Sequence, residues 1–192
     1  FASRPLLGRR VVVTRTRTQA SELARRLRGL GADPIEVPLI EIADPADGGA
    51  ALRRRAADWS DVAWLVLTSP NGVHRTLAHV PDVRALVGVR IAAVGPATAA
   101  ALAEHRIVAD LVPERFVAES LLDALPAPPS DTGAGRRVVI ARAAEARDVL
   151  PEGLTARGWD VEVVPAYRTV AATVSPDAAT GVADADAVTF TS

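Results

Sequence analysis

Five short segments of this sequence combine hydroxyl side chains, glycine or arginine in a pattern typical of anion-binding loops. Each follows an apolar run that resembles a β-strand. A strand that ends in such a loop and continues into a helix presents free backbone N–H groups, which bind anions. The candidate binding residues are Thr14, Arg15, Thr68, Ser69, Asn71, Gly72, Gly95, Thr98, Arg142, Thr191 and Ser192. We expect backbone donors to dominate, with Arg15 and Arg142 as supporting cations.

Residues 64–77, WLVLTSPNGVHRTL, leave two interpretations open. Pro, Asn and Gly mark turns, and Ser or Asn caps helices, so the segment can be a structural corner. It can equally supply N–H groups to an anion. One helix N-terminus stabilises a carboxylate by only about 0.3–1 kcal/mol. Several such loops acting together would therefore be needed to hold a polyanion.

Tyr167 is the only tyrosine of the chain and lies in the segment VPAYRT. One interpretation is a buried structural residue. The other is a catalytic proton donor, because a tyrosine hydroxyl is protonated at neutral pH.

Several classes of function are disfavoured by composition and by missing motifs. The 22 basic residues are all arginine, and with 23 acidic residues the net charge is −1, so nucleic-acid binding is not expected. Without Lys or Cys, Schiff-base and thiolate chemistry are excluded within this sequence. No GxGxxG, P-loop or HExxH motif is present, and His74, His79 and His105 lack ligand spacing, so no metal site is predicted. No apolar run is long enough to cross a membrane and the first residues lack a signal-peptide core, so we expect a cytoplasmic protein.

The order of predicted elements indicates an α/β fold with parallel sheets. Strand patterns alternate with helical patterns such as 18–31, 95–105 and 118–125. The predicted strands are 9–14, 34–42, 63–68, 89–95, 136–141, 161–167 and 186–191. Because strand-to-helix loops of parallel sheets collect at one edge, we expect the loops beginning at Thr14, Ser69, Gly95, Arg142 and Thr191 to face one interdomain cleft.

An internal repeat predicts two similar domains. At an offset of 127 residues, RVVVTR (10–15) matches RVVIAR (137–142), and Ile40 matches Tyr167. At an offset of 123, SDVAWLVLTS (60–69) matches ADADAVTFTS (183–192). A second copy as long as residues 8–125 would reach about residue 252. The expectation from the repeat is therefore that a C-terminal part is missing.

Taken in order, these segments resemble the uroporphyrinogen-III synthase family. The similar segments are GRRVVVTRT (8–16), WLVLTSPNGV (64–73), AAVGPATAAAL (92–102), VPERFVAESLLDAL (112–125), VEVVPAYRT (161–169) and DAVTFTS (186–192). The resemblance implies two α/β domains joined by two crossing strands at 38–42 and 165–169. The first domain would combine 1–37 with 170–192 and be incomplete at its C-terminus, and the second would span 43–164. One departure is Arg106, where members of the family often have glycine.

The resemblance also implies an activity. The family's substrate is hydroxymethylbilane, a linear tetrapyrrole with eight carboxylates, which is cyclised to uroporphyrinogen III with inversion of the last pyrrole ring and loss of water. It implies no cofactor, a transient contact with the upstream deaminase, and a role for Tyr167 in assisting departure of the hydroxyl. Ser69 and residues 95–98 match the family's binding turns. The alternative from the residues alone is a two-lobed, non-catalytic ligand-binding or sensor module for a polyanionic small molecule.

Overall fold

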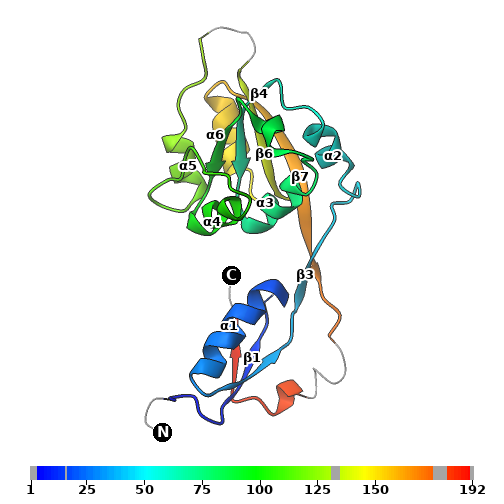
Figure 1. The fold of residues 1–192 in the computed structure, drawn as a ribbon, viewed down its shortest axis with the longest axis vertical. Helices are drawn as coiled ribbons and strands as arrows, with labels where there is room; N and C mark the ends of the chain where they lie inside the picture. The colour runs from blue at the N-terminus through cyan, green and yellow to red at the C-terminus, as the bar shows by residue number, and fades with distance from the viewer. Residues whose placement is uncertain (1–3, 16, 131–134, 175–180, 191–192) are drawn as a thin grey trace. The chain divides into compact units, whose positions relative to one another are not determined.

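The computed structural model describes residues 4–15, 17–130, 135–174 and 181–190, and Figure 1 shows its fold. Contacts divide the chain into two compact units, Phe1–Ala43 with Thr169–Ser192, and Asp44–Arg168. The chain passes between the units twice, directly after β3 (Ile40–Ala43) and within β7 (Asp160–Ala171). These two strands are hydrogen-bonded neighbours.

The smaller unit contains a three-stranded parallel sheet in the order β2-β1-β8. Its elements are β1 (Arg10–Val13), α1 (Arg17–Gly29), β2 (Asp33–Glu36) and β8 (Ala187–Thr189), and residues 181–183 are helical. The apolar residues of β1 are buried. At the start of β8 the Asp186 carboxylate accepts from the backbone N–H of Arg10 and from the Arg9 guanidinium, both at 2.8 Å. These contacts hold the pKa of Asp186 below its usual range.

The larger unit contains parallel strands in which β7, β6, β4 and β5 are successive neighbours. Strand β3 lies beside β7 in the same sheet, although its residues belong to the smaller unit. Its remaining elements are α2 (Ala50–Ala56), β4 (Val62–Leu67), α3 (Pro70–Leu77), a 3-10 helix η1 (Val83–Leu86), β5 (Arg90–Ala93), α4 (Pro96–Glu104), α5 (Ala118–Ala124), β6 (Arg137–Ala143) and α6 (Val149–Ala156). The prediction of an α/β protein with parallel sheets is confirmed.

Helices α5 and α6 lie beside each other on the sheet of the larger unit (Figure 1). Successive side chains of a strand point to opposite faces, so alternate residues of β4, β5 and β6 face this helix pair. The resulting cluster of buried residues consists of Trp64, Val66, Ala92, Leu121, Leu125, Val138, Ile140, Leu150, Leu154 and Trp159. The intervening strand residues, including Leu65, Leu67 and Val139, are also fully buried, as expected for a parallel sheet covered on both faces.

The internal repeat is reproduced in the strand register. Arg10 pairs with Asp33 in the smaller unit and Arg137 with Asp160 in the larger one, and both pairs are related by the offset of 127 residues. Likewise Val188 on β8 and Leu65 on β4 take equivalent places beside β1 and β6, at the offset of 123. The two sheets therefore share strand order and register over their common strands.

One predicted strand is divided in two. The run 34–42 forms β2 and β3, with residues 37–39 between them outside any strand. Pro38 lies in this gap, and proline has no N–H to donate to a sheet. The prediction of a single continuous strand over 34–42 was therefore wrong.

Arg106 ends α4 in a conformation that favours glycine. The N–H of Arg106 donates to the Ala103 carbonyl at 2.9 Å and that of Ile107 to the Leu102 carbonyl at 3.1 Å, which is a Schellman motif. Helices α1 and α6 end in the same way at Gly31 and Gly158, both with positive φ. Arg106 has φ 60°, and it is the only described non-glycine residue with positive φ.

Arg106→Gly is therefore expected to increase the free energy of unfolding by about 0.5–1 kcal/mol, because glycine adopts this conformation without steric cost. The measurement is urea denaturation followed by tryptophan fluorescence. Glu104→Gly is the matched control, since residue 104 lies within α4 and the same replacement should destabilise by about 0.5–1 kcal/mol. Equal destabilisation by both variants would contradict the role assigned to the backbone of Arg106.

Candidate active site

The carboxyl ends of β4, β5 and β6 bring three of the predicted loops to one sheet edge. Ser69 follows β4, Gly95 follows β5 and Arg142 lies at the end of β6, and these strands are parallel neighbours. Thr14 and Arg15 follow β1 in the other unit. Thr191 and Ser192 lie outside the described residues.

Ser69 forms the N-cap of α3. Its extended backbone (φ −159°, ψ 158°) and the following Pro70 start the helix, and its hydroxyl accepts from the Gly72 N–H at 3.1 Å. Gly72 is closely packed, because a Cβ at this position would lie 3.2 Å from the Ala141 carbonyl oxygen and 3.4 Å from Ser69 Oγ, so a larger residue would require its neighbours to shift. The capping interpretation of this loop thus describes part of what Ser69 does.

The Ser69 hydroxyl also contacts the hydroxyl of Tyr167 on β7, with an Oγ–Oη distance of 2.9 Å. Tyr167 is buried, with 8% of its surface exposed. A serine hydroxyl has one hydrogen to donate and two lone pairs. It can therefore accept from Gly72 and donate to Tyr167, which leaves the tyrosine hydrogen available to another acceptor.

An irregularity in the sheet places Tyr167. Arg142 on β6 pairs with Pro165, but the next residue, Ala143, pairs with Tyr167, so Ala166 is an additional residue in β7. Because strand side chains alternate between faces, one extra residue changes the face onto which the following side chain points. Pro165 lacks the N–H of a regular ladder, which accounts for the irregularity at this position.

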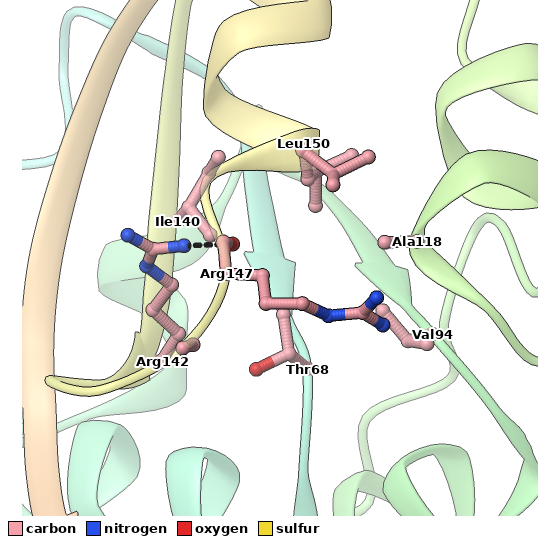
Figure 2. Close-up of a pocket in the computed structure, with 9 residues that line it drawn as sticks. Thr68, Val94, Ala118, Ile140, Arg142, Arg147 and Leu150 are labelled. Carbon is pink, nitrogen blue, oxygen red and sulfur yellow. Dashed lines mark hydrogen bonds between the residues drawn. The ribbon is translucent and has the colours of Figure 1, made fainter.

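A pocket of about 180 Å³ opens beside this edge, within the larger unit (Figure 2). Its residues come from the ends of β4, β5 and β6, from the first residue of α5, and from the loop before α6 with the start of that helix. They are Thr68, Val94, Ala118, Ile140, Arg142, Ala146, Arg147, Val149 and Leu150. The walls are mainly apolar, with two guanidinium groups among the lining residues. Such a pocket suits a ligand group that has an apolar stem and an anionic end.

Arg142 is buried and engaged by its own loop. Its guanidinium donates to the backbone carbonyl of Arg147 and to the carboxylate of Asp148 (Figure 2 shows the first of these bonds). Its Nε is buried without a hydrogen-bond partner among the described residues. Both terminal nitrogens of Arg142 are therefore engaged within the loop, and its predicted role as a supporting cation for the ligand stays a prediction.

Arg147 is the second cation of the pocket, and it is not one of the binding residues predicted from the sequence. Its side chain is exposed and runs past Thr68 toward Val94 in Figure 2. The only signal in the sequence is its position in the same strand-to-helix loop as Arg142, five residues later. Without coordinates, neither arginine of the loop can be preferred.

The remaining candidates lie near this edge but not in the pocket. Asn71 is in the first turn of α3 and partly buried, Gly95 is the N-cap of α4, and Thr98 is buried in the first turn of α4. None of the three is among the lining residues. Their role in binding stays a prediction.

Within the described ranges, no group of three or more His, Asp or Glu side chains is arranged to hold a metal ion. His74 and His105 are adjacent, with 3.5 Å between Nδ1 of the former and Nε2 of the latter, which the sequence analysis did not foresee. No helix in the described part of the chain has the length and apolar character required to span a membrane.

The fold and this edge define a two-unit parallel α/β protein with hydroxyl, backbone and guanidinium donors gathered at the carboxyl ends of its strands. Comparison with known proteins finds a family with this fold. A family profile described as uroporphyrinogen-III synthase HemD matches residues 21–192. The chain therefore belongs to the uroporphyrinogen-III synthase family, and the family assignment made from the sequence is confirmed.

Two curated relatives and one solved structure illustrate the similarity. Uroporphyrinogen-III synthase of Synechococcus elongatus is 35% identical over 181 residues, covering 92% of this chain and 67% of that protein. Porphyrin biosynthesis protein HemD of Ruminiclostridium josui is 31% identical over 173 residues, covering 88% of this chain and only 34% of the relative. A crystal structure of a mutant uroporphyrinogen III synthase from Thermus thermophilus has a TM-score of 0.63 at 20% identity. The match covers 94% of this chain and 71% of the Thermus chain, and it supports the fold.

Proposed function

We propose that the protein containing this chain cyclises hydroxymethylbilane to uroporphyrinogen III. Family membership supports the reaction. The structural observation that best supports a catalytic role is the hydrogen bond between Ser69 and Tyr167 at the carboxyl edge of the sheet, because it orients the only tyrosine of the chain.

In this proposal Tyr167 assists departure of the substrate hydroxyl. The C–O bond breaks, the phenol proton joins the leaving hydroxyl to form water, and the tetrapyrrole is left as an electrophilic azafulvenium cation beside the Tyr167 phenolate. The hydrogen-bond chain from the Gly72 N–H through the Ser69 hydroxyl stabilises the resulting phenolate, because both bonds point toward the developing charge. The proton returns to Tyr167 when the cyclised product loses a proton.

Ring closure then depends on how the substrate is held. Attack of the last pyrrole ring on the azafulvenium cation gives a spiro intermediate, and fragmentation with recombination inverts that ring. Positioning outweighs acid–base chemistry in such a sequence, since the electrophile reacts readily once formed. Backbone and arginine donors around the carboxylates serve this purpose.

We also infer that the two compact units are the two domains of the family's plan, joined by crossing strands at 38–42 and 165–169. The division of contacts after Ala43 and after Arg168 supports this inference. A transient contact with the upstream deaminase and a cytoplasmic location stay predictions from the sequence.

The test is to supply hydroxymethylbilane to the full-length protein and to separate the product isomers by chromatography. We expect the type III isomer to predominate, whereas a parallel sample without protein should give the spontaneous type I isomer. Tight binding of the tetrapyrrole with only type I product would replace the proposal with the non-catalytic binding module. Absence of both binding and type III product would contradict both functions.

A further inference from the structure

The two arginines of the loop between β6 and α6 have different environments. Arg142 is buried, with 7% of its surface exposed, and two of its donors bond the carbonyl of Arg147 and the carboxylate of Asp148. Arg147 is exposed, and no hydrogen bond or ion pair to its guanidinium is recorded among the residues that the structure describes. Asp148, the neighbouring acid, is already paired with Arg142. The positive charge of Arg147 is therefore available to a ligand at the pocket.

We propose that this pocket binds one propionate side arm of the tetrapyrrole, with Arg147 donating to the carboxylate and Arg142 acting as a positioning residue for Arg147. This inference rests on the proposed function, because it takes the tetrapyrrole as the ligand. It assigns to Arg147 the contact that the sequence pattern assigned to Arg142.

The size of the pocket selects a side arm and not the ring system. Pockets that bury a drug-sized ligand have volumes of about 300–1,000 Å³. The volume here is about 180 Å³. A tetrapyrrole is larger than most such ligands, so only a peripheral group can enter while the rings stay outside.

The apolar lining favours a propionate side chain of the substrate over the shorter acetate. Val94, Ala118, Ile140, Val149 and Leu150 form an apolar wall. Burying a methylene group against apolar side chains is favourable in proportion to the area removed from water. A propionate has one methylene more than an acetate, so it covers more of this wall while its carboxylate reaches Arg147.

Arg142 fixes the place from which Arg147 projects. Its bond to the Arg147 carbonyl, shown in Figure 2, holds the backbone of that residue. Its bond to Asp148 holds the residue that precedes α6. A guanidinium offers donors in a rigid fork, which allows it to make both bonds at once. Lysine at position 142 would keep the charge and lose this geometry.

The experiment measures binding of two porphyrins to the full-length protein by fluorescence titration. Uroporphyrin III carries acetates and propionates, whereas coproporphyrin III keeps the propionates and has methyl groups in place of the acetates. Arg147→Gln is expected to weaken binding of both by about 10-fold, the loss of one charge-assisted hydrogen bond. It should also lessen the decrease in affinity with added salt. Arg54→Gln, which removes an exposed charge from α2 in the same unit, should change either affinity less than about twofold.

Three other binding results would contradict the proposal. Weaker binding of uroporphyrin III alone would show that Arg147 holds an acetate, which contradicts the propionate assignment. Unchanged affinity of both porphyrins for Arg147→Gln, when the unmodified protein binds them, would remove Arg147 from the site and leave the proposed function intact. Failure of the unmodified protein to bind either porphyrin would overturn this inference, whereas the proposed function is decided separately by whether the type III isomer forms from hydroxymethylbilane.

Arg142→Lys tests the positioning role. If Arg142 acts through Arg147, this variant should lose about the same affinity as Arg147→Gln, and combining the two changes should cause little further loss. Additive losses in the double variant would instead mean that Arg142 contacts the ligand itself. Circular dichroism and urea denaturation of each variant separate these results from unfolding.

Discussion

Leu154→Ala is expected to lower the free energy of unfolding of the larger unit by about 2–5 kcal/mol. Leu154 is fully buried on α6 and belongs to the cluster between α5, α6 and the sheet. The replacement loses the transfer free energy of the side chain and leaves a cavity that close-packed neighbours fill only in part. Since domains are typically stable by about 5–15 kcal/mol, this single change removes a large fraction of the total.

The tryptophans make the measurement specific. All three, Trp59, Trp64 and Trp159, belong to the larger unit, so their fluorescence during urea denaturation reports this unit alone. Thr155→Ala is the matched control, because Thr155 neighbours Leu154 on α6 but is exposed, and the change should lie within about 0.5 kcal/mol. A loss below about 1 kcal/mol for Leu154→Ala would show that the cluster is not the core described here.

The repeat allowed much of the fold to be predicted from the sequence. Positions 127 residues apart, such as Arg10 and Arg137, occupy equivalent places in sheet register. The glycines that end α1 and α6 are also repeat partners, Gly31 and Gly158. Both kinds of feature are local: apolar strands and left-handed turn positions depend on residues close in sequence, so a single chain reveals them.

The contacts of the candidate site could not be predicted from the sequence because they are not local. Ser69 and Tyr167 lie 98 residues apart, and no pattern in either segment indicates that their hydroxyl groups meet. The extra residue in β7 that turns Tyr167 depends on pairing with β6, which is visible only in coordinates. Arg142 is a predicted binding residue because it ends a strand, whereas its burial and its two bonds within its own loop are visible only in coordinates. Residue type and strand position cannot distinguish a buried guanidinium from an exposed one.

Tyr167→Phe in the full-length protein is expected to lower the rate of type III formation by up to about 10²-fold, without unfolding the protein. General-acid assistance contributes about 10²–10⁴-fold, and the lower end applies because azafulvene formation also proceeds unaided. The aromatic ring remains in place, so the stability loss should be limited to one hydrogen bond, about 0.5–1.5 kcal/mol. The measurement is single-turnover kinetics with hydroxymethylbilane, so that product release does not mask the chemical step.

Ser69 provides the control that distinguishes catalysis from structure. Ser69→Ala removes the donor that would stabilise the Tyr167 phenolate, so it should slow the same step by a smaller factor. It also removes the N-cap of α3, which costs about 1 kcal/mol of stability and is measured separately. If Ser69 acts on the reaction only through Tyr167, the double variant should be no slower than Tyr167→Phe alone. If the fold-reductions of the two single variants multiply in the double variant, the two hydroxyl groups act independently. An unchanged rate for Tyr167→Phe would leave their hydrogen bond as a structural contact between β7 and α3.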